Sequence, residues 1–290
     1  MRMVIVVVLA LAAVAPRPAD PVVFAPGVIS TGHEFTVTFT GDGREVYFTR
    51  STASPRSMHV MHSVMRDGAW QPAEPVSFST GSSFDLDPAL SPDGRRLYFV
   101  STRQRPAQRA TTVSPARDMD IWFADRIGDQ WGAPHWIEEL SSDAKEGSPT
   151  VDRDGTLCFF SDRGAASGNN AIYCATRLAN AWSGPNRLDA NVNAGPSDTS
   201  PFLSRDGKTL MFYSTRAGGM GKADLYLSVK RDGEWQPAAN LGSVVNGPEF
   251  EYNPAVSPDG LSFFFGRAGN IHVVPVAELD VRVITPAMFK

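Results

Sequence analysis

The sequence has few of the residues that most often carry chemistry, with two cysteines and five histidines among 290 residues. Two cysteines are too few for a disulfide-rich scaffold or for a zinc site built from paired cysteines. There is no excess of positive charge either, because 27 Lys and Arg face 31 Asp and Glu and give a formal net charge of −4. That balance argues against a partner bound through a nucleic-acid phosphate backbone. The overall composition also disfavours a disordered chain or a multi-span membrane protein.

One apolar run stands at the start of the chain. Met1 and Arg2 precede about 13 apolar residues, 3–15, which end in small side chains. A basic residue, a short apolar run and a small-residue end are typical of a secretory signal peptide, and a bilayer span needs about 20 residues. We therefore predict a signal peptide at residues 1–19 and an exported chain, periplasmic or secreted, at 20–290. An uncleaved anchor helix is the alternative.

The two cysteines, Cys158 and Cys174, are 16 residues apart. We expect them on neighbouring strands of one hairpin, where a disulfide would form only if their Cα atoms lie within about 7 Å. A disulfide would fit an oxidising compartment, and two buried free thiols are the alternative. Neither cysteine has the histidine partner that a catalytic nucleophile requires.

An internal repeat organises the rest of the chain, which is rich in glycine and proline, with 25 and 22 residues. The segment that runs from Ser91 through Asp93-Gly94 to Ser101 recurs from Ser204 to Ser214 and again, in part, from Ser257 to Phe265. Weaker copies bring the number of Asp-Gly pairs to five, which begin at positions 42, 93, 154, 206 and 259. Asp-Gly between two apolar runs is a strong signal for a β-hairpin, because both residues tolerate a positive φ.

Each copy predicts four strands. A short strand precedes the Asp-Gly turn, an aromatic strand follows it, and a third strand comes after a loop. In four copies a tryptophan (Trp70, Trp131, Trp182, Trp235) and then a proline mark a fourth strand at the edge, where a missing donor is tolerated. Four antiparallel strands in about 50 residues, without helical periodicity, are typical of a β-propeller blade. The tryptophans, at equivalent positions, are interpreted as packing anchors.

We therefore predict an all-β fold, a five-bladed β-propeller of four-stranded antiparallel blades in a ring closed by a terminal strand. The expected blades are 31–80, 81–142, 143–194, 195–247 and 248–290. The fifth copy has no tryptophan-bearing outer strand, so residues 21–29, or alternatively 281–284, are expected to supply it.

The repeat resembles that of the TolB-type WD40-like β-propeller family. The likeness rests on the Ser-Pro-Asp-Gly-x-x-Leu-Tyr-Phe core, on the segment from Gly218 to Tyr226 and on the later Trp-x-x-Pro. It extends over about residues 30–275, nearly all of the predicted mature chain. It implies an exported bacterial propeller that binds a partner, and it is far more specific for the fold than for the function.

A carboxylate precedes the proline of the first strand by three residues in four copies, and Glu34 holds the loosely matching place in the first. These five acids are the candidate ligand-binding ring at one mouth of the channel: Glu34, Asp85, Glu146, Asp198 and Glu251, with Asp87 as a sixth acid beside them. A candidate basic collar is expected at the same end of the blades, formed by Arg103, Arg163 and Arg216, with Arg50 and Arg267 nearby.

Three interpretations of the acid ring stay open. The acids can pair with these arginines or with backbone donors in a purely structural role. They can bind a cation or a basic peptide, or two of them can act as a general acid and base on a sugar. We expect a non-catalytic binding module of the bacterial cell envelope, whose partner is an envelope protein or a glycan. The alternative is a carbohydrate-active enzyme, a glycoside hydrolase or lyase.

Further expectations concern sites, partners and segments that the chain should lack. We expect no catalytic residue, no cofactor, no metal site, no nucleic-acid partner, no membrane span after the signal peptide is removed, and a monomer. His59 and His62 are three residues apart, which on a strand places their side chains on opposite faces. They therefore make a poor metal site.

Overall fold

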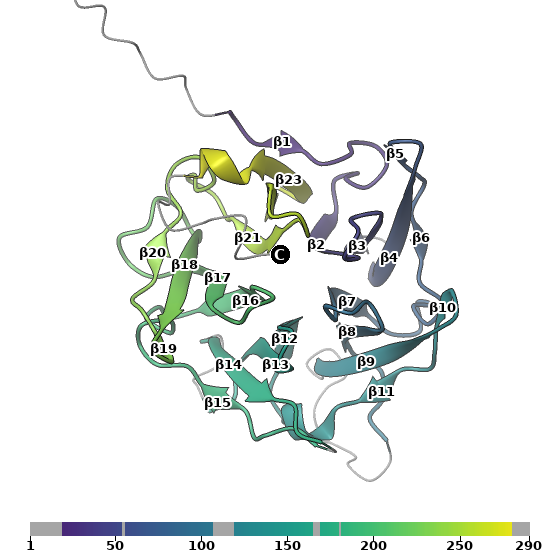
Figure 1. Cartoon of the computed structure of the whole chain (residues 1–290), viewed down its shortest axis with the longest axis horizontal. Helices are drawn as coiled ribbons and strands as arrows, with labels where there is room; N and C mark the ends of the chain where they lie inside the picture. Colours follow the sequence, from purple (N-terminus) through teal and green to yellow (C-terminus); the bar gives the residue numbers. More distant parts are fainter. Residues whose placement is uncertain (1–18, 54–55, 107–118, 165–168, 180, 280–290) are drawn as a thin grey trace, which may run out of the picture.

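The computed structural model describes residues 19–53, 56–106, 119–164, 169–179 and 181–279. Five antiparallel sheets stand like blades around a central channel, with the first strand of each sheet innermost (Figure 1). The predicted all-β fold with five blades is confirmed. Most of the predicted signal peptide, and the alternative edge strand at 281–284, lie outside the described residues. No helix within the described ranges is long and apolar enough to cross a membrane.

The strands follow the chain from blade to blade. Blade 1 holds β2 (Glu34–Phe39), β3 (Glu45–Ala53), β4 (Arg56–Arg66), β5 (Ala69–Trp70) and β6 (Glu74–Pro75). Blade 2 holds β7 (Asp85–Leu90), β8 (Arg96–Ser101), β9 (Asp120–Ile127), β10 (Gln130–Trp131) and β11 (His135–Trp136). Blade 3 holds β12 (Glu146–Val151), β13 (Thr156–Ser161), β14 (Ala171–Thr176) and β15 (Asn186–Arg187). Blade 4 holds β16 (Asp198–Leu203), β17 (Thr209–Ser214), β18 (Asp224–Arg231), β19 (Glu234–Trp235) and β20 (Ala239–Asn240).

Blade 5 is assembled from both ends of the chain. It holds β21 (Tyr252–Val256), β22 (Ser262–Arg267), β23 (Asn270–Pro275) and, at its outer edge, β1 (Val22–Val23). Val22 and Val23 pair antiparallel with Val273 and His272, so the predicted closure by a terminal strand is confirmed (Figure 1). Two short 3₁₀ helices complete the secondary structure, η2 (Glu138–Leu140) and η3 (Val276–Glu278).

The proline after each outer-strand tryptophan interrupts the fourth strand. In blades 1, 2 and 4 this strand consists of two short segments, both of which pair with the third strand. The tryptophan lies in or beside the first segment and turns toward the preceding blade. Trp182 packs with Tyr98 of blade 2, and Trp235 packs with Cys158 and Ile172 of blade 3. The interpretation of the tryptophans as packing anchors is therefore confirmed at these interfaces.

The hydrophobic core is divided into five clusters, one between each pair of neighbouring blades. Because both faces of an inner strand meet a neighbour, aromatic residues such as Phe99, Phe159 and Phe212 are fully buried. Within blade 3, Cys158 and Cys174 lie directly opposite each other on β13 and β14, with their Cα atoms 4.1 Å apart, and form a disulfide. Of the two alternatives for this pair, a disulfide and two free thiols, the structure contains the disulfide.

Candidate functional site

The five predicted ring acids lie at equivalent positions around one end of the channel, which we call the acid end. Four of them open the innermost strands β2, β7, β12 and β16, and Glu251 directly precedes β21. All five residues have an exposed fraction of 0%. The inner strands then run to the opposite end, where the five Asp-Gly turns lie and which we call the turn end. The predicted clustering at one end is therefore present, but the carboxylates are buried rather than open to solvent.

Each acid is held by one arginine of its own blade, and we call these contacts the ring pairs. The nitrogen–oxygen distances are 2.7 Å for Arg50–Glu34, 2.6 Å for Arg103–Asp85, 2.8 Å for Arg163–Glu146, 2.8 Å for Arg216–Asp198 and 2.9 Å for Arg267–Glu251. The three predicted collar arginines and the two that were expected nearby thus have the same role, since each pairs with one ring acid. A buried carboxylate needs such a partner, because an unpaired charge is expensive in a low-dielectric interior.

The arginines reach their acids from two different positions in the sequence. In blades 2, 3 and 4 a serine faces the acid across the ladder, and the arginine two residues later folds back onto it. In blade 1, Arg50 itself lies opposite Glu34. Each guanidinium also lies over an aromatic ring of its second strand, 5.0–5.4 Å from the centroid of Phe48, Phe99, Phe159, Phe212 or Phe265.

Several ring arginines also donate to the loop that enters from the preceding blade. Arg50 donates to the carbonyls of Val28 and Ile29, at 3.2 and 3.1 Å. Arg163, Arg216 and Arg267 donate in the same way to Leu140, Val192 and Val245. In these four blades the ring pair therefore joins the first strand, the second strand and the inter-blade loop at a single point. It stiffens the loops that form the surface at the acid end.

The pKa values of two ring acids show how closely burial and pairing compete. Burial opposes ionisation of Glu34, but hydrogen bonds from Thr31, Arg50 and the backbone of residues 31–33 outweigh it and lower the pKa. For Glu146, burial is the larger effect and raises the pKa despite hydrogen bonds from Ser142 and the charge of Arg163.

The geometry at the acid end is thus the one in which every ring acid is tied to an arginine. It brings together all five acids and all five arginines, but it does not aim the carboxylates at the channel axis as an open funnel. Ligand binding by the ring acids stays a prediction. Replacement of Glu146, Asp198 and Glu251 by arginine would place each new cation against the arginine that now binds the carboxylate. Like charges in a buried layer would unfold the chain, so these variants would not report on binding.

A second ring of polar side chains lies two residues after each acid, nearer the channel axis. These residues have positive φ angles of 47–52° at a β-bulge in each inner strand, and they are Thr36, Asp87, Ser148, Ser200 and Asn253. Their side chains join neighbouring blades. Asn253 donates to Thr36 at 2.6 Å, and Thr36 donates to Asp87 at 2.7 Å. The sequence signal for this ring was a polar residue directly before the proline in four of the blades, whereas Thr36 of blade 1 precedes a valine.

Asp87 is the carboxylate of this second ring. Its partners are the hydroxyl of Thr36 and the amide and hydroxyl of Ser148, and no arginine of the described residues pairs with it. Burial raises its pKa, as expected for a carboxylate without a cationic partner. The channel beside it has a cavity volume of only about 80 Å³, lined by Pro88, Pro149 and their equivalents. Asp87 itself is not among the residues that line this cavity.

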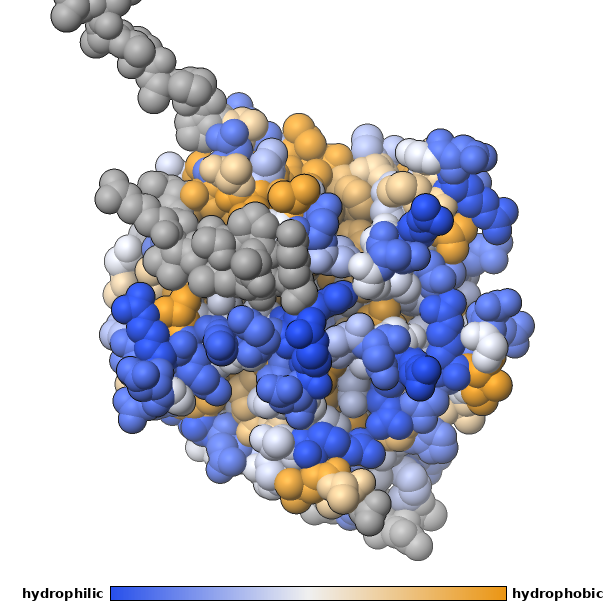
Figure 2. All heavy atoms as spheres, in the orientation of Figure 1, coloured by the Kyte–Doolittle hydropathy of each residue, from blue (hydrophilic) through white to orange (hydrophobic). Residues whose placement is uncertain are grey.

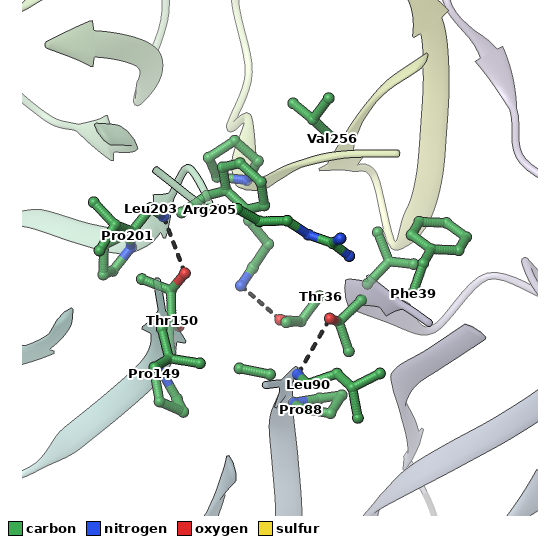
Figure 3. Close-up of a pocket in the computed structure, with 18 of the residues that line it drawn as sticks. Thr36, Phe39, Pro88, Leu90, Pro149, Thr150, Pro201, Leu203, Arg205 and Val256 are labelled. Carbon is green, nitrogen blue, oxygen red and sulfur yellow. Dashed lines mark hydrogen bonds between the residues drawn. The ribbon is translucent and has the colours of Figure 1, made fainter. Parts of the chain in front are cut away.

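The turn end of the channel has a feature that the sequence analysis missed. Arg205, directly before the Asp-Gly turn of blade 4, extends its side chain across the cavity toward Phe39 of blade 1 (Figure 3). Its Nη1 atom would lie 3.8 Å from a Cβ added to Gly41. Partial burial and the charge of Arg153 lower the pKa of Arg205. The signal that could have revealed it was the residue before each Asp-Gly pair, which is an arginine in blades 3 and 4 alone.

A second cavity lies beside this arginine, between blades 1 and 5. It has a volume of about 350 Å³, and its lining includes the aromatic residues Phe24, Phe39, Trp70 and Phe264. Asp42 and Asp259 of the two neighbouring turns complete its rim. The space-filling view shows apolar side chains gathered near β1 and β23, where the ring closes (Figure 2).

Comparisons with known proteins bear on the fold alone. No protein-family model and no curated protein matches the chain. A crystal structure of TolB from Acinetobacter baumannii is similar over 86% of this chain and 56% of its own, with 16% identity and a TM-score of 0.51. A putative TolB from Agrobacterium tumefaciens is similar over 80% of this chain and 69% of its own, with 16% identity and a TM-score of 0.51. The catalytic domain of a Coprinopsis cinerea GH62 α-L-arabinofuranosidase is similar over 86% of this chain and 92% of its own, with 12% identity and a TM-score of 0.53. The chain therefore spans little more than half of the first TolB, and TolB and a glycosidase catalytic domain both share its fold.

Proposed function

We propose that this chain is a non-catalytic binding module of the bacterial cell envelope, which engages a protein or a glycan at a mouth of its central channel. The observation that carries the proposal is the neutralisation of all five ring acids by arginines. A general acid and base must reach the substrate with their carboxyl groups, and a retaining or inverting glycosidase needs two of them about 5–10 Å apart across a sugar. Buried carboxylates that already bind guanidinium groups do not meet that need.

The ring pairs instead favour a rigid surface at the acid end. The loops there begin and end at the paired residues, so their positions are set before any partner arrives. Pre-ordered loops on a rigid scaffold lower the entropy lost on binding. The acids would then serve recognition through the loops that they hold, rather than by contact with the partner.

One pair of these loops presents apolar side chains to solvent. Met220 and Phe250 are 49% and 48% exposed, on loops that meet where Ala223 bridges to Phe250. Buried Asp224 accepts hydrogen bonds from the amides of Met220 and Gly221 and so fixes the first loop. A Cβ on Gly221 would lie 2.0 Å from the carbonyl oxygen of Gly247, so only glycine allows the loops to approach this closely. Exposed methionine and aromatic side chains are typical of protein-binding surfaces.

The test is partner capture from an envelope extract of the source organism, followed by measurement of affinity for the purified partner. We expect the double variant Met220→Ser/Phe250→Ser to lose capture while its melting temperature stays unchanged. Ile127→Ser is the matched control, because Ile127 is 70% exposed at the opposite end of its blade. Equal affinity of the double variant and the wild type would overturn a partner surface at the acid end. The enzyme alternative is separated from the proposal by turnover of a polysaccharide.

A further inference from the structure

Arg205 carries a guanidinium group that differs from those of the five ring arginines. Among the described residues its guanidinium has no hydrogen-bond acceptor and no carboxylate partner, although it is partly buried at the turn end. The ring arginines show what the fold does with a guanidinium that it uses for its own stability, since each of those five is paired within 2.6–2.9 Å. An unpaired guanidinium presents a planar fork of donors that matches a carboxylate or a phosphate.

The fold does not require a charge at this position. The residues that directly precede the other Asp-Gly pairs are Gly41, Pro92, Arg153 and Pro258. Three of these four are uncharged, so the turn forms without an arginine. Arg205 is therefore not explained by the repeat, and partial burial of its charge opposes stability. A group of this kind is a candidate for binding an anion.

The neighbouring cavity indicates what the anion is attached to. Phe39 and Pro258 line both the channel and the aromatic cavity between blades 1 and 5, so the two spaces are adjacent. The aromatic rings provide apolar contact for a flat ligand. Asp42 adds an acceptor, because its Oδ1 atom holds the turn through Thr40 and Arg44 while no described residue donates to its Oδ2 atom. Hydrogen bonding by Thr40 lowers the pKa of Asp42, which keeps it ionised.

A sugar that bears a carboxylate combines these three chemistries. Its hydroxyl groups can donate to Asp42, its C–H face can pack on the aromatic rings, and its carboxylate can pair with Arg205. A cationic ligand would suit the aromatic rings and Asp42, but Arg205 would repel it. A wholly apolar side chain would leave both Asp42 and Arg205 without partners. We propose that the turn end of the channel, between blades 1 and 5, binds a uronate residue of an acidic glycan.

This site lies at the opposite end from Met220 and Phe250, so it goes beyond the proposed function and can fail separately from it. The probes are methyl glucuronide and methyl glucoside, which differ only in the carboxylate, with acetate and inorganic phosphate as anions that lack a sugar ring. Binding is measured by NMR titration of the ¹⁵N-labelled chain, with the Arg205 Nε–H signal as a local reporter.

We expect the wild type to bind the glucuronide at least tenfold more tightly than the glucoside, because hydrogen bonds to charged groups are worth tenfold or more. Arg205→Gln should abolish this preference, and Arg205→Lys should keep part of it. Arg95→Gln, which removes an exposed cation beside the Asp-Gly turn of blade 2 at the same end, and the Met220→Ser/Phe250→Ser variant should bind like the wild type. Equal binding of both sugars, no binding of either, or an unchanged preference in Arg205→Gln overturns the proposal. If acetate or phosphate binds as tightly as the glucuronide, the sugar part is overturned.

Discussion

Removal of one ring arginine tests whether the ring pairs stabilise the fold as the structure indicates. In Arg163→Met the chain loses the 2.8 Å contact with Glu146, a 3.0 Å hydrogen bond to Ser161 and the donation to the Leu140 carbonyl. Breaking a buried pair from one side costs about 3–5 kcal/mol. Because the Arg163 side chain is 20% exposed, water can replace part of the interaction, and we expect the lower end, about 3 kcal/mol.

The assay is urea unfolding at pH 7, followed by tryptophan fluorescence. Lys222→Met is the matched control, since Lys222 and Glu249 form an ion pair whose side chains are 57% and 65% exposed, and we expect a loss below about 1 kcal/mol. Glu146→Gln/Arg163→Met should recover much of the stability, because no charge is then left buried without a partner. A loss in Arg163→Met no greater than that in Lys222→Met would refute the reasoning.

The remaining predictions concern the channel, the ring closure and the disulfide. Burial raises the pKa of Asp87 above its unfolded value, so the native chain holds this proton more tightly, and its stability falls as the pH rises through the native pKa. Asp87→Asn should gain stability relative to the wild type as the pH rises above the ordinary range of a carboxyl group, and a stability difference between the two chains that does not change with pH would contradict the assignment. Phe24→Ala should lower the free energy of unfolding by about 2–3 kcal/mol, because Phe24 packs edge-on against Trp70 at 5.8 Å, and a melting temperature within 1 °C of the wild type would argue against closure by this segment. Replacement of Cys158 and Cys174 by alanine should cost about 3 kcal/mol, from the 16-residue loop that the disulfide closes, and mass spectrometry of the intact wild-type chain should find no free thiol.

Much of the fold follows from the repeat in the sequence. The five Asp-Gly pairs fix the hairpins, and the tryptophan and proline that follow fix an interrupted outer strand. The closure was predictable in outline because blade 5 lacks an outer strand and an apolar segment, 21–29, precedes blade 1. The choice between that segment and 281–284 depended on tertiary packing of Phe24 in the seam between blades 1 and 5, which periodicity does not encode.

The site was only partly predictable, for a physical reason. Equivalent positions in a repeat place residues at equivalent points of the ring, so the clustering of Glu34, Asp85 and their counterparts could be read from the sequence. Whether a carboxylate faces solvent or a guanidinium depends on side-chain direction, and Arg50 and Arg163 reach their acids from different positions of the repeat. Arg205 was missed because the sequence marks it only as one of two arginines that precede an Asp-Gly pair, and the direction of its side chain across the channel is a tertiary feature (Figure 3).

The most direct test of the central claim is a single measurement on the purified chain, namely the release of new reducing ends from a panel of neutral and acidic polysaccharides. The account predicts retention of a ligand without turnover, since each ring carboxylate is committed to an arginine. Sustained release of reducing ends, abolished by substitution of a ring acid in a variant that remains folded, would contradict it.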